Sequence, residues 1–188
     1  MPIPLGILAV AGAGAAGVVN DYFWLETTVL SSNAASVTFS NLGNYSQYKH
    51  LQIRWTTRDS WSDNFASTNI RFNGDSGANY ASHRLWGNGS SALSAADTSI
   101  TEMRINLTAA ALSDANTFSA GVTDILDFSS TSKNKTIRTL HGVVSPGEVT
   151  AITLQSGFRN NTAAITSISF SAVSNFVSGS RFSLYGIR

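Results

Sequence analysis

The chain has 188 residues, of which 43% are hydrophobic, and this is enough for one domain with a substantial core. Only 12% of the residues are charged and the formal net charge is +1, so the chain lacks the basic footprint of proteins that bind nucleic acid or anionic membranes. The absence of cysteine excludes disulfides, thiolate catalysis and cysteine-based zinc sites.

Small polar residues take the place of the missing charges, with 28 Ser, 18 Thr and 15 Asn in the chain. Such a surface is neutral and compatible with β-structure. Because few charges keep separate copies apart, we expect the protein to form a homo-oligomer.

Residues 1–20 are predicted to form an extended N-terminal arm. The first nineteen residues carry no charge, and Pro2, Pro4 and four glycines oppose a stable helix. A spanning helix needs about 20 predominantly apolar residues, and a secretory signal needs a basic start, so neither class fits well. A flexible terminus is the alternative. Exposed apolar residues favour burial against another subunit, and the residues predicted to bind it are Ile3, Leu5, Ile7, Leu8, Val10, Val18 and Val19.

Residues 21–188 are predicted to form a single β-sandwich domain. After two expected strands at 23–30 and 35–39, the side chains of Leu51, Ile53 and Trp55 alternate with polar neighbours. This period of two places the three apolar side chains on one face of a strand. They are therefore expected to lie in the core.

Ile70 and Phe72 repeat the alternation and lead directly into Asn73-Gly74. Because both turn residues tolerate positive φ, this dipeptide predicts a tight turn between strands. Further strands are predicted at 79–86, 99–107, 117–128, 136–143, 149–156, 165–172 and 181–187, with a surface loop at 87–99 and a short helical turn at 109–115. About ten or eleven short strands favour an antiparallel sandwich of the jelly-roll kind.

Several segments resemble those of a group of small tailed-bacteriophage virion proteins. The most distinctive are RFNGDSGANY at 71–80 and GSRFSLYGIR at 179–188. They are accompanied by SVTFSNL at 36–42, YKHLQIR at 48–54, DILDFSSTSKNKTIR at 124–138 and NNTAAITSI at 160–168. The resemblance covers about residues 21–188. It implies a β fold and a place in the virion, on the capsid surface or the tail, and it brings no catalytic residues with it.

The sequence contains few candidate catalytic residues. His50, His83 and His141 fall on separate predicted strands without metal-ligand spacing, so we expect surface or cross-strand positions for them. Asp124 and Asp127 are the best acid pair for glycoside hydrolysis. Residues three apart on a strand point to opposite faces, however, so Asp127 is expected to fix a turn instead.

Two further groups are candidate binding sites. Asn73, Asp75 and Asn79 form an oxygen-rich loop, but calcium usually takes several carboxylates, and hydrogen bonds within the turn are the favoured interpretation. Trp61 and Trp86 lie beside polar loops and are the candidates for stacking on a glycan, although packing in the core or at subunit contacts is favoured.

These observations predict a non-enzymatic virion structural protein without a cofactor. We expect it to decorate or cement the capsid through repeated contacts with other virion proteins, either major capsid or tail proteins, and through its N-terminal arm. A homotrimer is favoured by analogy with threefold positions in virions. No nucleic-acid or membrane partner is expected. The alternative is a tail-fibre or tail-tip component, such as a carbohydrate-binding receptor module, and a depolymerising enzyme would need paired acids in a groove.

Overall fold

The computed structural model describes residues 21–145 and 149–188, and this part of the chain is built almost entirely from β-strands. It contains one short 3-10 helix, η1 (Leu42–Tyr45), between the second and third strands. The twelve strands are β1 (Tyr22–Val29), β2 (Ala34–Phe39), β3 (His50–Thr57), β4 (Phe65–Phe72), β5 (Tyr80–Gly87), β6 (Ala92–Ile100), β7 (Met103–Ala109), β8 (Ser119–Leu126), β9 (Lys135–Ser145), β10 (Val149–Arg159), β11 (Ile168–Phe176) and β12 (Arg181–Ile187).

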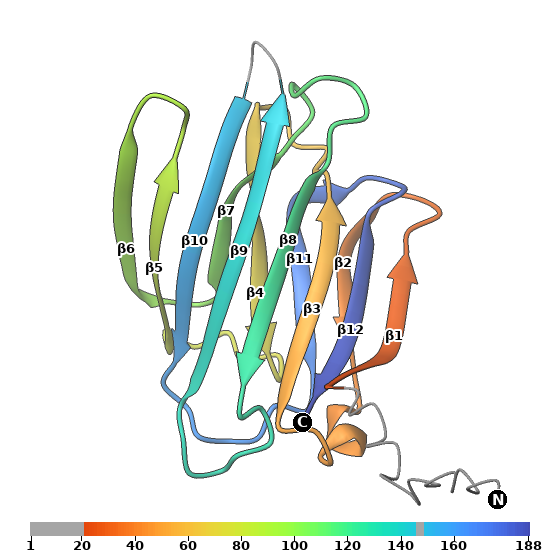
Figure 1. The fold of residues 1–188 in the computed structure, drawn as a ribbon, viewed down its shortest axis with the longest axis vertical. Coiled ribbons are helices and arrows are strands. Elements are labelled where there is room, and N and C mark those ends of the chain that lie inside the picture. Colours follow the sequence, from red (N-terminus) through yellow and green to blue (C-terminus); the bar gives the residue numbers. More distant parts are fainter. Residues whose placement is uncertain (1–20, 146–148) are drawn as a thin grey trace, which may run out of the picture.

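The strands form two antiparallel sheets packed as a sandwich (Figure 1). The larger sheet has the order β1-β12-β3-β8-β9-β10-β5-β6, and the smaller has the order β2-β11-β4-β7. When β5, β6, β9 and β10 are set aside, the remaining eight strands in chain order pair as first-eighth-third-sixth and second-seventh-fourth-fifth. This is the jelly-roll topology, so the predicted fold is confirmed.

The four strands that were set aside are two hairpins, β5–β6 and β9–β10, which extend the larger sheet on one side. In Figure 1 the smaller sheet lies behind the middle of the larger one, and β6 has no strand of the smaller sheet behind it. The extension therefore adds sheet surface that the jelly roll does not need for its own closure.

The core lies between the two sheets and contains the side chains predicted from the alternating pattern. Leu51, Ile53 and Trp55 on β3 are buried, as are Ile70 and Phe72 on β4. The predicted inward faces of both strands are confirmed. Burial of such large apolar side chains is the main source of stability in a sandwich of this kind.

The predicted turn after β4 is also confirmed. Asn73 has φ 55° and Gly74 has φ 67°, so both residues adopt the left-handed conformation. The N–H of Asp75 then donates to the carbonyl oxygen of Phe72 over 3.0 Å and closes the turn. A residue without a β-branch is needed at both turn positions.

Three predicted segments are wrong. The single strand predicted at 99–107 is divided between β6 and β7, with a bend at 101–102. The stretch predicted as a surface loop contains β6 (Ala92–Ile100), which pairs along β5 (Tyr80–Gly87). Its small residues have little strand propensity of their own, so pairing with β5 determines its conformation. The helical turn predicted at 109–115 is a non-helical connection, because β7 extends to Ala109 and turns follow it.

Candidate functional site

Exposed apolar side chains gather on the outer face of the sheet extension. Alternation along β9 buries Thr139, His141 and Val143 and turns the intervening side chains outward. Cross-strand register aligns Leu140 with Leu154. We define the apolar stripe as five residues whose exposed fractions lie between 47% and 66%, namely Leu85, Leu140, Val144, Ile152 and Leu154. Contiguous exposed apolar patches of this kind commonly mark interaction surfaces.

An open hollow of about 790 Å³ lies beside the stripe on this face. Ala120 and Gly142 face each other on neighbouring strands and, as small residues, leave space between larger neighbours. Leu140, Val144 and Ile152 also line the hollow. The hollow has a volume typical of binding sites, and its lining is mainly apolar.

Arginine and aromatic side chains border the other side of the hollow. The guanidinium carbon of Arg54 lies 4.6 Å from the ring centroid of Tyr185 and 5.4 Å from that of Tyr22. Among the described residues, neither Arg54 nor Arg181 forms an ion pair with a carboxylate. Trp24 pairs with Tyr185 in register and is 65% exposed. This side of the face therefore combines positive charge with accessible aromatic rings.

The aromatic side was not predicted from the sequence. Tyr22 and Trp24 alternate with Phe23 and Leu25, so the first four positions of this strand are all apolar or aromatic and the pattern there cannot distinguish its two faces. The only sequence feature that could have indicated this aromatic surface is the two-residue spacing of Tyr22 and Trp24.

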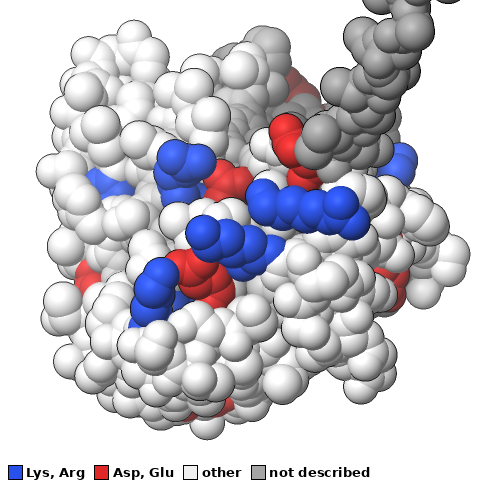
Figure 2. Space-filling view, turned by 60° about the horizontal axis from the view of Figure 1, so that its bottom comes forward, with Lys and Arg blue, Asp and Glu red and all other residues white. Residues whose placement is uncertain are grey.

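A row of polar side chains crosses the outer face below the apolar stripe. Gln52 donates from Nε2 to Asp124 Oδ1 over 2.8 Å, and Arg138 Nη2 lies 2.8 Å from Asp124 Oδ2. Figure 2, which brings the lower end of Figure 1 forward, shows basic and acidic side chains adjacent to one another there, within a largely uncharged surface. The charges in this row are thus already partnered.

Asp124 and Asp127 do not form a facing acid pair. Asp127 lies just after β8 with φ 47°, and its carboxylate is 2.6 Å from Lys133 Nζ. The hydrogen bond from Lys133 is the largest influence that holds the pKa of Asp127 below its ordinary value of 3.8. Each acid therefore serves a separate ion pair, and the expected role of Asp127 in a turn is confirmed by the bond from the Ser130 N–H to its carbonyl oxygen.

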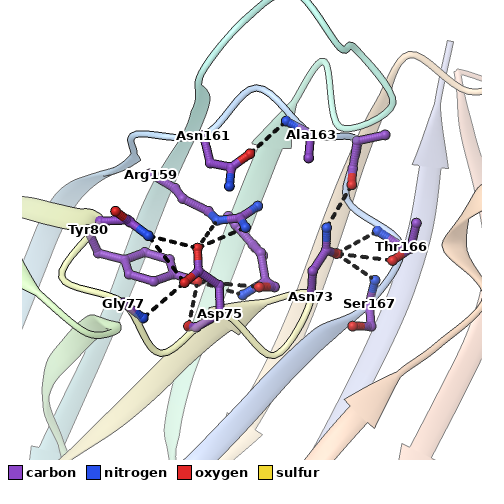
Figure 3. A network of polar contacts seen from close by, with 12 residues as sticks. Asn73, Asp75, Gly77, Tyr80, Arg159, Asn161, Ala163, Thr166 and Ser167 are labelled. Atoms are coloured by element: carbon purple, nitrogen blue, oxygen red, sulfur yellow. Dashed lines mark hydrogen bonds and ion pairs between the residues drawn. The ribbon is translucent and has the colours of Figure 1, made fainter.

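The loop after β4 holds a network of hydrogen bonds (Figure 3). Asp75 Oδ1 accepts from the N–H of Gly77 over 2.9 Å, and Asp75 Oδ2 lies 2.9 Å from both Nε and Nη2 of Arg159. Asn79 Nδ2 also donates to the Asp75 carboxylate. The carboxylate is therefore neutralised by a side chain that is 4% exposed.

Asn73 points away from this carboxylate. Its Oδ1 accepts from the backbone N–H groups of Thr166 and Ser167, and its Nδ2 donates to the carbonyl oxygen of Ala164. The predicted hydrogen bonds within the turn are thus confirmed for Asp75 and Asn79, whereas Asn73 links β4 to the segment before β11. Within the described residues, no group of three or more His, Asp or Glu side chains is placed to hold a metal ion.

The two tryptophans predicted as a glycan platform belong to separate elements. Trp61 lies in the loop between β3 and β4 and is nearly half exposed. Trp86 lies on β5 and is only partly exposed, with the Arg84 guanidinium carbon 5.3 Å from its ring centroid. Trp61 and Trp86 are not among the aromatic pairs in contact in the described part of the chain.

The three histidines also occupy separate places. His50 accepts the backbone N–H of Asp127 at Nδ1, and His83 is exposed on β5. His141 is a cross-strand residue, but it is buried against Trp55, at 5.7 Å between ring centroids. Burial lowers the pKa of His141 to about 4, so its ring is neutral at neutral pH.

The arm residues Ile3, Leu5, Ile7, Leu8, Val10, Val18 and Val19 lie outside the described residues. In the described segments, no helix has the length and hydropathy that crossing a membrane requires. No protein-family model, curated protein or solved structure matches the chain.

Proposed function

We propose that this protein is a non-enzymatic structural protein of a bacteriophage virion, which decorates or cements the capsid. The observation that supports this proposal best is the apolar stripe on the outer face of the extended sheet. In this account the stripe docks on neighbouring virion proteins, and residues 1–20 act as a second anchor.

The jelly roll and its extension have different roles in this proposal. The eight jelly-roll strands provide most of the main core, to which the hairpins add Tyr80 and Ile137, whereas the outer faces of β5, β9 and β10 carry the apolar stripe. Protein interfaces commonly have an apolar centre and a polar rim. Here the stripe would form the centre, and the row of Gln52, Asp124 and Arg138 would form one side of the rim.

Several features favour a structural role over catalysis. The carboxylates of Asp75, Asp124 and Asp127 are each held by a basic side chain, which is a structural use of these acids. A compact sandwich also suits a knob on a capsid better than a long tail fibre. We propose a homotrimer by analogy with threefold positions in virions.

The second candidate is a carbohydrate-binding module at the tail. It is favoured by the exposed ring of Trp24 beside Tyr185 and Arg54, because sugars stack on accessible aromatic faces. Binding to a glycan array that is lost in Trp24→Ala would favour this candidate over capsid decoration. Loss in Trp61→Ala instead would place the glycan at the loop predicted from the sequence.

The double variant Leu140→Glu/Leu154→Glu tests the docking role of the stripe. Burying one aliphatic side chain contributes about 1.5–3 kcal/mol, so losing two should weaken binding to particles by more than about tenfold. Because both side chains are outward and exposed, the melting temperature should change little. Co-sedimentation with purified particles that lack the native protein measures the binding.

The matched control is Ser36→Glu/Thr38→Glu, which adds two charges to exposed positions on β2 of the smaller sheet. This control should bind particles like the wild type. Equal binding by the stripe variant, the control and the wild type would show that the outer face of the extended sheet is not the docking surface.

A further inference from the structure

The two sheets end in four edge strands, β1 and β6 in the larger sheet and β2 and β7 in the smaller. An edge strand presents unpaired N–H and C=O groups, which pair readily with another chain unless the edge is interrupted. Three of the edges are interrupted by irregular pairing with their neighbours: β1 near Trp24, β2 opposite the segment from Ser171 to Phe176, and β7 opposite the segment from Ala66 to Thr68.

The β6 edge has no such interruption between Ala92 and Asp97. Over this stretch its register with β5 is continuous, and the pairing becomes irregular only beyond it, between Tyr80 and Ser82 of β5. The stretch contains no proline, lysine or arginine. Its one charged residue, Asp97, lies 2.8 Å from Arg84 of β5 and is neutralised within the hairpin.

The hairpin geometry identifies which backbone groups of β6 are free. The N–H of Asn88 donates to the carbonyl oxygen of Ser91 over 3.2 Å and closes the β5–β6 hairpin. In an antiparallel pair, hydrogen-bonded and non-hydrogen-bonded positions alternate. Counting from this closing pair, Leu93 and Ala95 bond to β5. The residues that direct their N–H and C=O groups to the free side are therefore Ala92, Ser94 and Ala96.

We propose that β6 pairs antiparallel with β6 of a second copy of this chain about a twofold axis. The axis passes between the two Ala95 residues, so that Ser94 lies opposite Ala96 of the second copy and Leu93 opposite Asp97. The two larger sheets then become one continuous sheet. Because the contact is isologous, a single pairing satisfies both free edges and closes.

The side chains of β6 fit a second copy of the same strand. Small side chains at Ser94, Ala95 and Ala96 allow close approach without clashes at the axis. The two Asp97 carboxylates lie apart from each other, and each keeps its partner Arg84, so pairing brings no uncompensated like charges together. β6 is also exposed along most of its length and has no strand of the smaller sheet behind it, so no other part of the fold blocks the approach (Figure 1).

This pairing is independent of the docking role proposed for the apolar stripe, because the free groups lie in the plane of the sheet and the stripe projects from its face. It is a twofold contact, distinct from the homotrimer expected from the sequence. An experiment can therefore rule out the β6 pairing without ruling out the docking role of the stripe or the homotrimer, and the reverse.

The variant Ala96→Pro tests the pairing in the full-length protein. Proline removes an N–H that points to the free edge and leaves the bonds to β5 in place, which is the position where an edge strand tolerates it. We expect sedimentation equilibrium to show twofold association of the wild type, as a dimer or as a pair of the proposed homotrimers, with at least a tenfold larger dissociation constant for this association in Ala96→Pro. Ala96→Val, which keeps the N–H, should associate like the wild type. A wild type without twofold association, or equal twofold association of all three proteins, would overturn the proposal.

A cysteine variant provides a test that does not depend on how the fold tolerates proline. The chain has no cysteine, so Ala95→Cys introduces a single thiol. At a non-hydrogen-bonded antiparallel pair the Cα atoms are about 4.5 Å apart, within the range that a disulfide spans. Mild oxidation should link Ala95→Cys into a covalent dimer much faster than Ser36→Cys, a control on the exposed surface of β2. Equal rates for the two variants would contradict the proposed register.

Discussion

Phe72→Ala is expected to lower the free energy of unfolding by about 3–5 kcal/mol. The Phe72 side chain is fully buried at the end of β4, and its backbone accepts and donates hydrogen bonds with the Tyr80 hydroxyl. Truncation removes apolar contacts and leaves a cavity that a closely packed sandwich fills only in part. Urea-induced unfolding followed by tryptophan fluorescence measures the loss.

Phe158→Ala is the matched control, because it removes the same side chain from the outer face of β10, where it is 39% exposed. The cost there should be below about 1.5 kcal/mol, since much of the ring is already in contact with water. Similar losses for Phe72→Ala and Phe158→Ala would mean that the buried face of β4 has been assigned wrongly.

Asp75→Ala is expected to destabilise the fold by about 3–5 kcal/mol, because removing one partner of a buried ion pair leaves the other charge unpaired. The remaining Arg159 side chain is only 4% exposed, so its charge would stay largely shielded from water. Arg138→Ala, at an ion pair whose arginine is exposed, should cost at most about 1 kcal/mol. Equal costs at the two positions would show that Arg159 finds other partners.

The same carboxylate gives the fold a pH dependence. The hydrogen bond from the Gly77 N–H, followed by those from Arg159 and Asn79, holds the pKa of Asp75 below its ordinary value of 3.8, against the opposing effect of burial. Because the folded-state pKa is lowered, this stabilisation is present above about pH 4 and is lost as the pH falls through the folded-state pKa. Asp75→Asn should unfold with a smaller acid dependence than the wild type in the same urea titrations. An unchanged acid dependence would mean that other groups cause it.

The parts of the fold that the sequence predicts are those where local pattern and tertiary structure agree. Leu51, Ile53 and Trp55 alternate with polar residues on a strand that has one buried face, so periodicity is enough to identify that face. Asn73-Gly74 is similarly informative, because few dipeptides accept two successive positive φ angles.

The β6 strand could not be predicted in this way. Its residues ALSAADTSI are mostly small, without a regular apolar alternation, and are as typical of a loop as of a strand. The strand exists because β5 provides a partner along its length, and a partner brought close by folding leaves no mark in local composition.

The candidate docking face was missed for a different reason. Along β9 and β10 the outward residues Leu140, Ile152 and Leu154 are as apolar as many inward ones, whereas the inward face includes His141 and Thr153. With polar residues inside and apolar residues outside, alternation cannot identify the exposed face. Only the paired register of the strands shows that the apolar side chains align outside.

The most direct test of the proposed function is a reconstruction of intact virions of the bacteriophage proposed to carry this chain. The proposal predicts many copies on the capsid, with the outer faces of β9, β10 and β5 packed against neighbouring proteins and residues 1–20 running onto an adjacent subunit. Absence of the chain from purified particles would contradict the virion role. Its presence with the apolar stripe fully exposed to solvent would contradict the docking surface.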